Sequence, residues 1–361
     1  MKIAAIENTR NNSSATIDST LSCRSLRLAF PRGWDCSQAR LFQVNQPSCQ
    51  GGEVSRWPSL KFDTMARRTV KNLKMLSDST QTSAAAWQLS GAWGDRTYLM
   101  GVLNVTPDSF SDGGLYNTPV AALRQAEALV AAGADILDVG GQSTRPQAET
   151  VTLEVEQNRV LPVIRAIRSA GMSVPISIDT TRASVARAAI AVGATWVNDI
   201  SGGTYDPEML PTVAELNVPI VLMHLRGTPT TMQSLTEYQD LVGEIAAFLQ
   251  QRVQAAIAAG IAPNLIALDP GIGFAKTGTQ NLEILRRLRD LQFGYPLLVG
   301  TSRKSFIGHI LNQPDAQQRV WGTAATCCAA IAGGADILRV HDVREMRDVA
   351  LVADAIWRQV S

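Results

Sequence analysis

Eight short apolar runs recur along the chain from Trp87 onward, and a longer stretch with helical spacing follows each of them. The runs are Tyr98–Leu103, Ile136–Val139, Pro175–Ile178, Thr195–Asn198, Pro219–Met223, Leu265–Leu268, Pro296–Val299 and Ile337–Val340. The helical patterns lie near 120–132, 153–169, 182–192, 207–216, 238–259, 279–291, 317–332 and 343–358. Strands separated by helical crossovers predict a parallel sheet. Eight such units predict a single closed (β/α)8 barrel, the TIM barrel, which takes about 250 residues.

The N-terminal stretch, residues 1–85, differs from this pattern. It is rich in Ser, Thr, Asn, Gln and Arg and has no sustained helical or strand period, which predicts a disordered or loosely ordered extension. A dispensable tail is the simplest interpretation. An organelle transit peptide is a second, although the acidic residues and the length count against it. A misassigned start, with Met65 or Met75 as the true first residue, is a third. We expect residues 86–361 to form the barrel.

Charge and hydropathy restrict the classes of partner. No apolar run approaches the roughly 18 residues of a membrane span, so we expect no membrane partner. Residues 1–80 carry 12 Lys and Arg against 6 Asp and Glu, and residues 81–361 carry 21 against 26. The expected barrel is therefore mildly acidic, and we expect no nucleic-acid partner. The adjacent Cys327 and Cys328 suit neither a zinc site nor an ordinary disulfide, which fits a reducing cytoplasm.

Polar residues gather at the carboxyl ends of the apolar runs, which is where α/β barrels carry their active sites. In chain order they include Asn104, Thr144, Arg145, Pro146, Asp179, Asn198, His224, Asp269, Phe274 in the same loop, Lys304, Ser305, Arg339 and His341. Residues 81–361 contain two lysines, Lys276 and Lys304, and both follow strand ends. A single polar strand end is often a helix N-cap or a solvent contact. Polar residues at the ends of all eight apolar runs together predict a binding site.

The chemistry of these residues falls into two groups. Carboxylates and an amide suit the donor–acceptor edge of a heteroaromatic ring, and they are Asp179, Asn198 and Asp269. Residues that suit a phosphate or pyrophosphate are Arg145, Arg339, His341 and, as a neutral oxygen ligand, Asn104. Lys304 could serve either group. A magnesium ion held by one protein oxygen and by substrate phosphates is compatible with this set. The chain has neither a Rossmann nor a P-loop glycine motif.

Five motifs in chain order resemble signatures of the dihydropteroate synthase family. They occupy 101–114 (GVLNVTPDSFSDGG), 138–146 (DVGGQSTRP), 269–274 (DPGIGF), 300–305 (GTSRKS) and 339–342 (RVHD). The resemblance covers about residues 87–358. It implies condensation of 6-hydroxymethyl-7,8-dihydropterin pyrophosphate with 4-aminobenzoate to give 7,8-dihydropteroate and pyrophosphate, a step of folate synthesis and the target of sulfonamides. Many members carry Glu where this chain has Gln142, which puts one contact of that loop in doubt.

The resemblance also implies roles for individual residues. It implies that Asn104 contacts Mg2+, the expected cofactor. The residues it implies for the pterin are Asp179, Asn198, Asp269 and Lys304. It implies that Arg339 and His341 bind the pyrophosphate, near Thr144. The residues it implies for the aminobenzoate pocket are Thr144, Arg145, Pro146, Phe274, Lys304 and Ser305. We expect the catalytic residues to be Lys304, Arg339, His341 and Asp179. The resemblance further implies a cytoplasmic homodimer formed through the later helices.

Two alternative functions stay open from the sequence. A pterin-dependent methyltransferase would need the pterin-edge residues but neither the 101–114 loop nor the 302–305 segment, and both are present. A non-catalytic paralogue would bind pterin without turnover, and the intact Lys304 and Arg339 argue against it. His224, at the end of the fifth run, has no confident role in any of these interpretations.

Overall fold

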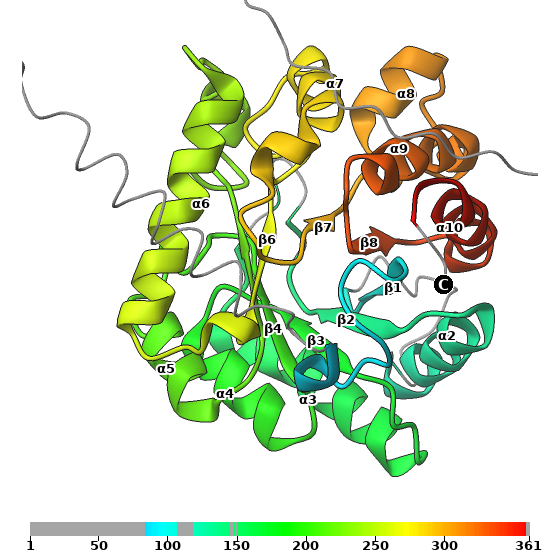
Figure 1. The fold of residues 1–361 in the computed structure, drawn as a ribbon. Helices are drawn as coiled ribbons and strands as arrows, with labels where there is room; N and C mark the ends of the chain where they lie inside the picture. Colours follow the sequence, from blue (N-terminus) through cyan, green and yellow to red (C-terminus); the bar gives the residue numbers. More distant parts are fainter. Residues whose placement is uncertain (1–83, 107–117, 145–147, 149, 359–361) are drawn as a thin grey trace, which may run out of the picture. The chain divides into compact units, whose positions relative to one another are not determined.

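The computed structural model describes residues 84–106, 118–144, 148 and 150–358, and these form a parallel β-barrel surrounded by helices (Figure 1). The strands are β1 Tyr98–Asn104, β2 Ile136–Gly140, β3 Ile176–Asp179, β4 Trp196–Asp199, β5 Ile220–Met223, β6 Ile266–Asp269, β7 Leu298–Val299 and β8 Ile337–Val340. Their order is β6-β5-β4-β3-β2-β1-β8-β7, and a parallel bridge between Leu268 and Leu297 links the two ends. The predicted (β/α)8 barrel is confirmed.

The helices follow the predicted alternation closely. They are α2 Thr118–Ala132, α3 Leu153–Ser169, α4 Ala183–Ala191, α5 Met209–Leu216, α6 Leu241–Ala258, α7 Gly278–Arg286, α8 Ser305–Leu311, α9 Val320–Ala332 and α10 Val343–Trp357. Short 3-10 turns are η1 Ala84–Trp87, η3 Met232–Ser234, η4 Pro263–Leu265, η5 Leu288–Leu291 and η6 Ala316–Arg319. The helix α8 was not predicted from the sequence. The predictions for residues 1–83 lie outside the described residues, so the boundary near 85 stays a prediction.

Strand register brings the last residues of neighbouring strands to one level. Asn104 pairs with Gly140, Gly140 with Asp179, and Asp179 with Asn198. All four are therefore next to one another at the carboxyl end of the barrel, although they come from β1, β2, β3 and β4. This register is the physical reason why residues separated by almost a hundred positions can share one site.

Aromatic side chains fill the opposite, amino-terminal end of the barrel. Trp87 and Trp196 are fully buried and pack edge to face with their ring centroids 4.5 Å apart. The indole nitrogen of Trp87 donates to the carbonyl of Asn264, and that of Trp196 donates to the carbonyl of Trp87. These two hydrogen bonds attach η1 to η4 and β4 at the amino-terminal end of the barrel. They also satisfy the buried indole N–H groups, which need hydrogen-bond partners.

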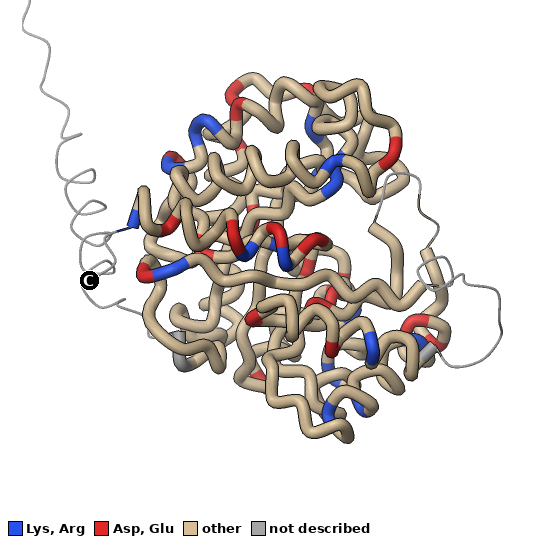
Figure 2. Tube along the Cα trace, turned by 90° about the vertical axis from the view of Figure 1, so that its right-hand side faces the viewer, with Lys and Arg blue, Asp and Glu red and all other residues tan. Residues whose placement is uncertain are grey.

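The surface of the barrel carries mixed charges. Figure 2 shows acidic and basic residues interspersed along the helices in that view. Within the described residues, no helix combines the length and the apolar character that a membrane crossing needs.

Candidate active site

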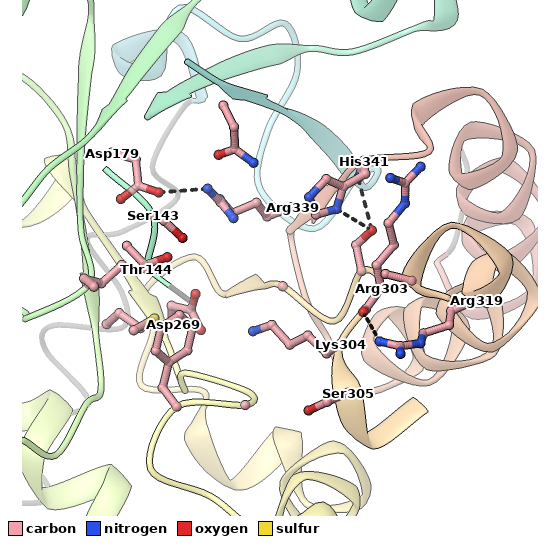
Figure 3. A pocket seen from close by; sticks show the side chains of 18 of the residues that line it. Ser143, Thr144, Asp179, Asp269, Arg303, Lys304, Ser305, Arg319, Arg339 and His341 are labelled. Atoms are coloured by element: carbon pink, nitrogen blue, oxygen red, sulfur yellow. Dashed lines mark hydrogen bonds and ion pairs between the residues drawn. The ribbon is translucent and has the colours of Figure 1, made fainter. Parts of the chain in front are cut away.

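A cavity of about 580 Å³ lies at the carboxyl ends of the strands (Figure 3). The candidate residues that line it are Asn104, Thr144, Asp179, Asn198, Asp269, Phe274, Lys304, Ser305, Arg339 and His341. Arg145 and Pro146 lie outside the described residues. The structure adds lining residues to which the sequence analysis gave no role, among them Ser143, Ser302, Arg303 and Met223. Ten of the predicted residues are thus brought together in one cavity, whereas His224 does not line it.

Arg339 on β8 bridges two carboxylates inside this cavity. Its Nε donates to Asp138 Oδ2 at 2.6 Å, and one of its terminal nitrogens donates to Asp179 Oδ2 at 2.8 Å. Asn198 Nδ2 also contacts Asp138, at 3.3 Å. Although burial disfavours its charge, the two carboxylates raise the pKa of Arg339 above its ordinary value. One guanidinium therefore balances two buried acids.

Asp138 is a functional neighbour that sequence reasoning missed. It lies in the middle of β2 and is completely buried. The sequence did carry a signal for Asp138, because it is a lone carboxylate between Leu137 and Val139 in an apolar run. A charge is rarely buried in a strand without a partner, so this position indicates a paired acid.

The carboxylates of the cavity are held in an environment that favours their protonated forms. Burial raises the pKa of Asp179 to about 7; Arg339 opposes this shift and the charge of Asp138 adds to it. Burial also raises the pKa of Asp269, against the opposing charge of Lys304. Desolvation thus outweighs the nearby cations at both positions, so the pKa of each acid lies above that of an exposed Asp.

This shift gives a stability prediction for Asp179. A carboxyl with a higher pKa in the folded chain holds more protons there than in the unfolded chain, between about pH 4 and about 7. The free energy of unfolding of the wild type should therefore fall relative to Asp179→Asn as pH rises through this window. The slope is at most about 1.4 kcal/mol per pH unit. Urea unfolding of both proteins at pH 5 and pH 8 measures this change in the free energy of unfolding. If the wild type instead becomes more stable relative to Asp179→Asn between pH 5 and pH 8, the raised pKa assigned to Asp179 is wrong.

Lys304 enters the cavity from the loop between β7 and α8, pointing toward Asp269 in Figure 3. Its Nζ donates to the carbonyl of Ile272 and lies 4.7 Å from the centroid of the Phe274 ring. Burial lowers the pKa of Lys304 to about 8; the charge of Asp269 opposes this and that of Arg339 adds to it. The amine is therefore part charged and part neutral near physiological pH.

The β7–α8 loop is tied to the end of β8. Ser302 Oγ accepts from the backbone N–H of His341 at 3.1 Å and lies 3.0 Å from His341 Nδ1. Arg303 forms an ion pair with Asp342, and Arg319 donates to the carbonyl of Arg303 at 2.9 Å (Figure 3). Arg303 has a φ of +60°, which is unusual for a residue other than glycine. These contacts fix the backbone that presents Lys304 to the cavity.

The metal prediction rests on Asn104. Asn104 and Asp179 flank Gly140 on the two neighbouring strands, and a Cβ added at Gly140 would lie 3.7 Å from both Asn104 Oδ1 and Asp179 Oδ2, so both oxygens border the space beside the glycine. Among the described residues, no group of three His, Cys, Asp or Glu could hold a metal ion. An amide and a carboxylate oxygen fit Mg2+, which often takes one or two protein oxygens and completes its shell with water and substrate phosphates.

Comparisons with known proteins show which family this chain resembles. The model of the pterin-binding enzyme family matches residues 100–341. A dihydropteroate synthase of Synechocystis sp. is 57% identical over 287 residues, which span 79% of this chain and 99% of that protein. The chain belongs to the dihydropteroate synthase family. Among solved dihydropteroate synthases, one from Clostridium difficile, crystallised in the presence of pteroic acid, has a TM-score of 0.70 at 43% identity and covers 74% of this chain and 99% of its own.

A second solved dihydropteroate synthase, from Xanthomonas albilineans with 4-aminobenzoic acid, has a TM-score of 0.69 and 43% identity, and covers 73% of this chain and 93% of its own. The alignment with dihydropteroate synthases therefore extends over nearly their whole length. The barrel of this chain therefore has the fold of these solved structures.

Proposed function

We propose that this chain condenses 6-hydroxymethyl-7,8-dihydropterin pyrophosphate with 4-aminobenzoate, releasing pyrophosphate and 7,8-dihydropteroate. The observation that carries this proposal is the cavity in which Arg339 faces Asp138 and Asp179 while Lys304 faces Asp269. Buried acids suit the nitrogen-rich edge of a pterin, and buried cations suit a pyrophosphate. The family membership supports the same reaction.

Each substrate then has its own part of the cavity. The pterin edge would contact Asp179, Asn198, Asp269 and Lys304. The pyrophosphate would contact Arg339 and His341, near Thr144. The aminobenzoate would contact Thr144, Phe274, Lys304 and Ser305 together with Arg145 and Pro146. Because Lys304 interacts both with Asp269 and with the Phe274 ring, the aminobenzoate would lie beside the pterin.

In this proposal the methylene C–O bond to pyrophosphate breaks as the aryl amine forms a C–N bond to the same carbon and then loses a proton. The electron-rich pterin stabilises positive charge on the methylene group, and the carboxylates of Asp179 and Asp269 stabilise it further. Arg339 and His341 stabilise the departing pyrophosphate. An aryl amine is already nucleophilic near neutral pH, so the protein chiefly orders two substrates, which can supply several kcal/mol of the barrier.

Magnesium is part of the proposal. Asn104, which lines the cavity, would hold the ion together with the substrate phosphates. When bound, the ion would neutralise charge on the pyrophosphate leaving group.

Turnover by the purified full chain tests this function. Incubation with Mg2+ and both substrates should release pyrophosphate and form dihydropteroate, and omission of 4-aminobenzoate should stop both. A methyltransferase would give neither product, and a non-catalytic paralogue would bind the pterin substrate without releasing pyrophosphate. Either result contradicts the proposal.

We also propose that the protein is a homodimer in the cytoplasm. Large apolar side chains are exposed on three consecutive helices, α8, α9 and α10, and they are Ile310, Leu311, Trp321, Leu351, Val352, Ile356 and Trp357. Trp321 is 77% exposed, and a contiguous exposed apolar patch usually marks an interface, so these helices would supply the dimer contact. The free thiols of Cys327 and Cys328 suit a reducing compartment.

Replacing Trp321 with lysine should weaken this association. The charge would be buried at the centre of the contact, so the mass measured by light scattering should fall from that of a dimer toward that of a monomer. Ile257→Lys on α6 is the matched control, because Ile257 is also an exposed apolar residue but lies away from these helices. An unchanged mass for Trp321→Lys contradicts the proposed interface.

A further inference from the structure

Two residues that the sequence singled out do not line the cavity, and the structure pairs them behind it. Lys276 follows β6 and is 3% exposed, and His224 follows β5 and is 2% exposed. Lys276 Nζ lies 2.9 Å from His224 Nδ1 and donates to the carbonyl of Phe274 at 2.9 Å. Both contacts of this buried amine are with other groups of the protein, so its role is to hold the protein structure and not to contact solvent.

The carbonyl that Lys276 holds belongs to the loop 270–277, between β6 and α7. Lys304 donates to the carbonyl of Ile272 in the same loop, from the cavity side. Tyr238 donates to the carbonyl of Ala275 at 3.0 Å, and Ala275 has a φ of +51°. Because a left-handed alanine is disfavoured, the loop needs outside contacts to keep this conformation. Lys276 belongs to the loop itself, and its contact with His224, which follows β5, connects the Phe274 carbonyl to a neighbouring part of the barrel.

Asp269, at the start of the same loop, is held by different contacts. The backbone N–H of Gly271 donates to Asp269 Oδ1 at 2.7 Å, and the backbone N–H of His224 donates to the Asp269 carbonyl at 2.9 Å. Both donors are backbone groups, so neither depends on the side chain of Lys276. Loss of that side chain should therefore affect Phe274 more than Asp269.

The surroundings of the pair disfavour a positive charge on either side chain. Burial lowers the pKa of Lys276 well below its ordinary value; Asp269 opposes this, and Lys304 and Arg226 add to it. Burial, together with Lys276 and Arg226, also lowers the pKa of His224 far below its ordinary range. The amine has an N–H group for each of its two partners, the Phe274 carbonyl and His224 Nδ1.

We propose that Lys276 is a positioning residue for the second substrate. Its amine, with His224 as hydrogen-bond acceptor, fixes the backbone that places the Phe274 ring at the aminobenzoate pocket. The inference rests on the proposed function, because it is that function which gives Phe274 the arylamine as its ligand.

Steady-state kinetics of Lys276→Met, with an independent binding measurement, test this role. The KM for 4-aminobenzoate should rise at least about tenfold, whereas the Kd for the pterin pyrophosphate, measured calorimetrically without the second substrate, should change less than about threefold. Should Lys276→Met not fold, Lys276→Gln carries the same test, because its amide is one bond too short to reach both partners.

Thr97→Val is the matched control. It removes a buried hydrogen bond, from Thr97 Oγ1 to Asp354 Oδ1 at 2.7 Å, at the amino-terminal end of the barrel. This control should leave both substrate constants unchanged. Three results would overturn the inference. The Lys276 variants could weaken the binding of both substrates equally, or they could leave the KM for 4-aminobenzoate unchanged. Thr97→Val could also raise the KM for 4-aminobenzoate while leaving the Kd for the pterin pyrophosphate unchanged. If the wild type forms no dihydropteroate in the same assay, the proposed function fails instead, and the inference fails with it.

Discussion

Replacement of Arg339 with methionine is expected to lower kcat/KM for the condensation by about 100- to 10,000-fold. Truncating one partner of a buried, hydrogen-bonded charge pair typically costs about 2–5 kcal/mol, and Arg339 also faces the site proposed for the departing pyrophosphate. Both effects act on the same cavity wall, since one guanidinium contacts Asp138 and Asp179. Initial rates of pyrophosphate release at varied pterin concentration measure the loss.

The same substitution should also destabilise the fold. Asp138 is completely buried and the Asp179 side chain is 6% exposed, so both carboxylates would lose their counter-charge in a region of low dielectric. Breaking a buried pair in this way costs about 3–5 kcal/mol. The cost should be smaller at pH 6 than at pH 8, because burial already raises the pKa of Asp179 to about 7 and a protonated acid needs no counter-charge. Urea unfolding at the two pH values measures the difference.

A double variant separates the two roles of Arg339. Arg339→Met combined with Asp138→Asn removes one of the two uncompensated charges and keeps the shape of the β2 side chain, so part of the stability should return. The activity should not, because the cation that binds pyrophosphate is still missing. Full recovery of turnover in the double variant would show that Arg339 only balances Asp138, and near wild-type rates in the single variant would exclude any catalytic part for it.

The sequence predicted the barrel because each strand and helix carries its own local signal. The helix 153–169 was predicted with the bounds that the structure shows, since Thr152 caps its first turn and its apolar residues keep a helical period. The helix α8 was not predicted, because its seven residues make only two turns, too few to establish a period. Its end did carry a signal: Asn312 adopts a φ of +51°, a conformation typical of asparagine after a helix.

The site was predictable as far as strand ends could be identified. Parallel register brings those ends together, so the residues that line the cavity could be read in order along the chain. Pairings across the closed barrel could not be read, because they depend on packing between distant elements. Arg339 and Asp138 are 201 positions apart, and His224 and Lys276 are 52 apart. In sequence, His224 and Lys276 look like further cavity residues; in three dimensions they hold the loop behind the cavity.

Lys304→Met is the second substitution with a large expected effect, a fall in kcat/KM of about 100- to 1,000-fold, which corresponds to roughly 2.7–4 kcal/mol. The variant loses the donor to the Ile272 carbonyl, the cation over the Phe274 ring and the charge that faces Asp269. Initial rates at varied concentrations of each substrate measure the loss. Because Lys304 touches the proposed positions of both substrates, both apparent affinities should weaken, unlike the split expected for Lys276→Met.

The pH dependence of kcat/KM identifies which protonation state of Lys304 is the active one. Its pKa of about 8 means that the free enzyme loses this positive charge as pH rises above that value. Since kcat/KM reports the free enzyme, its alkaline limb should have a midpoint near pH 8. Lys304→Arg keeps a charge that does not titrate in this range, so its lower peak rate should persist to higher pH. An alkaline limb in the same place in Lys304→Arg would assign the titration to another group and remove the charge of Lys304 from the mechanism.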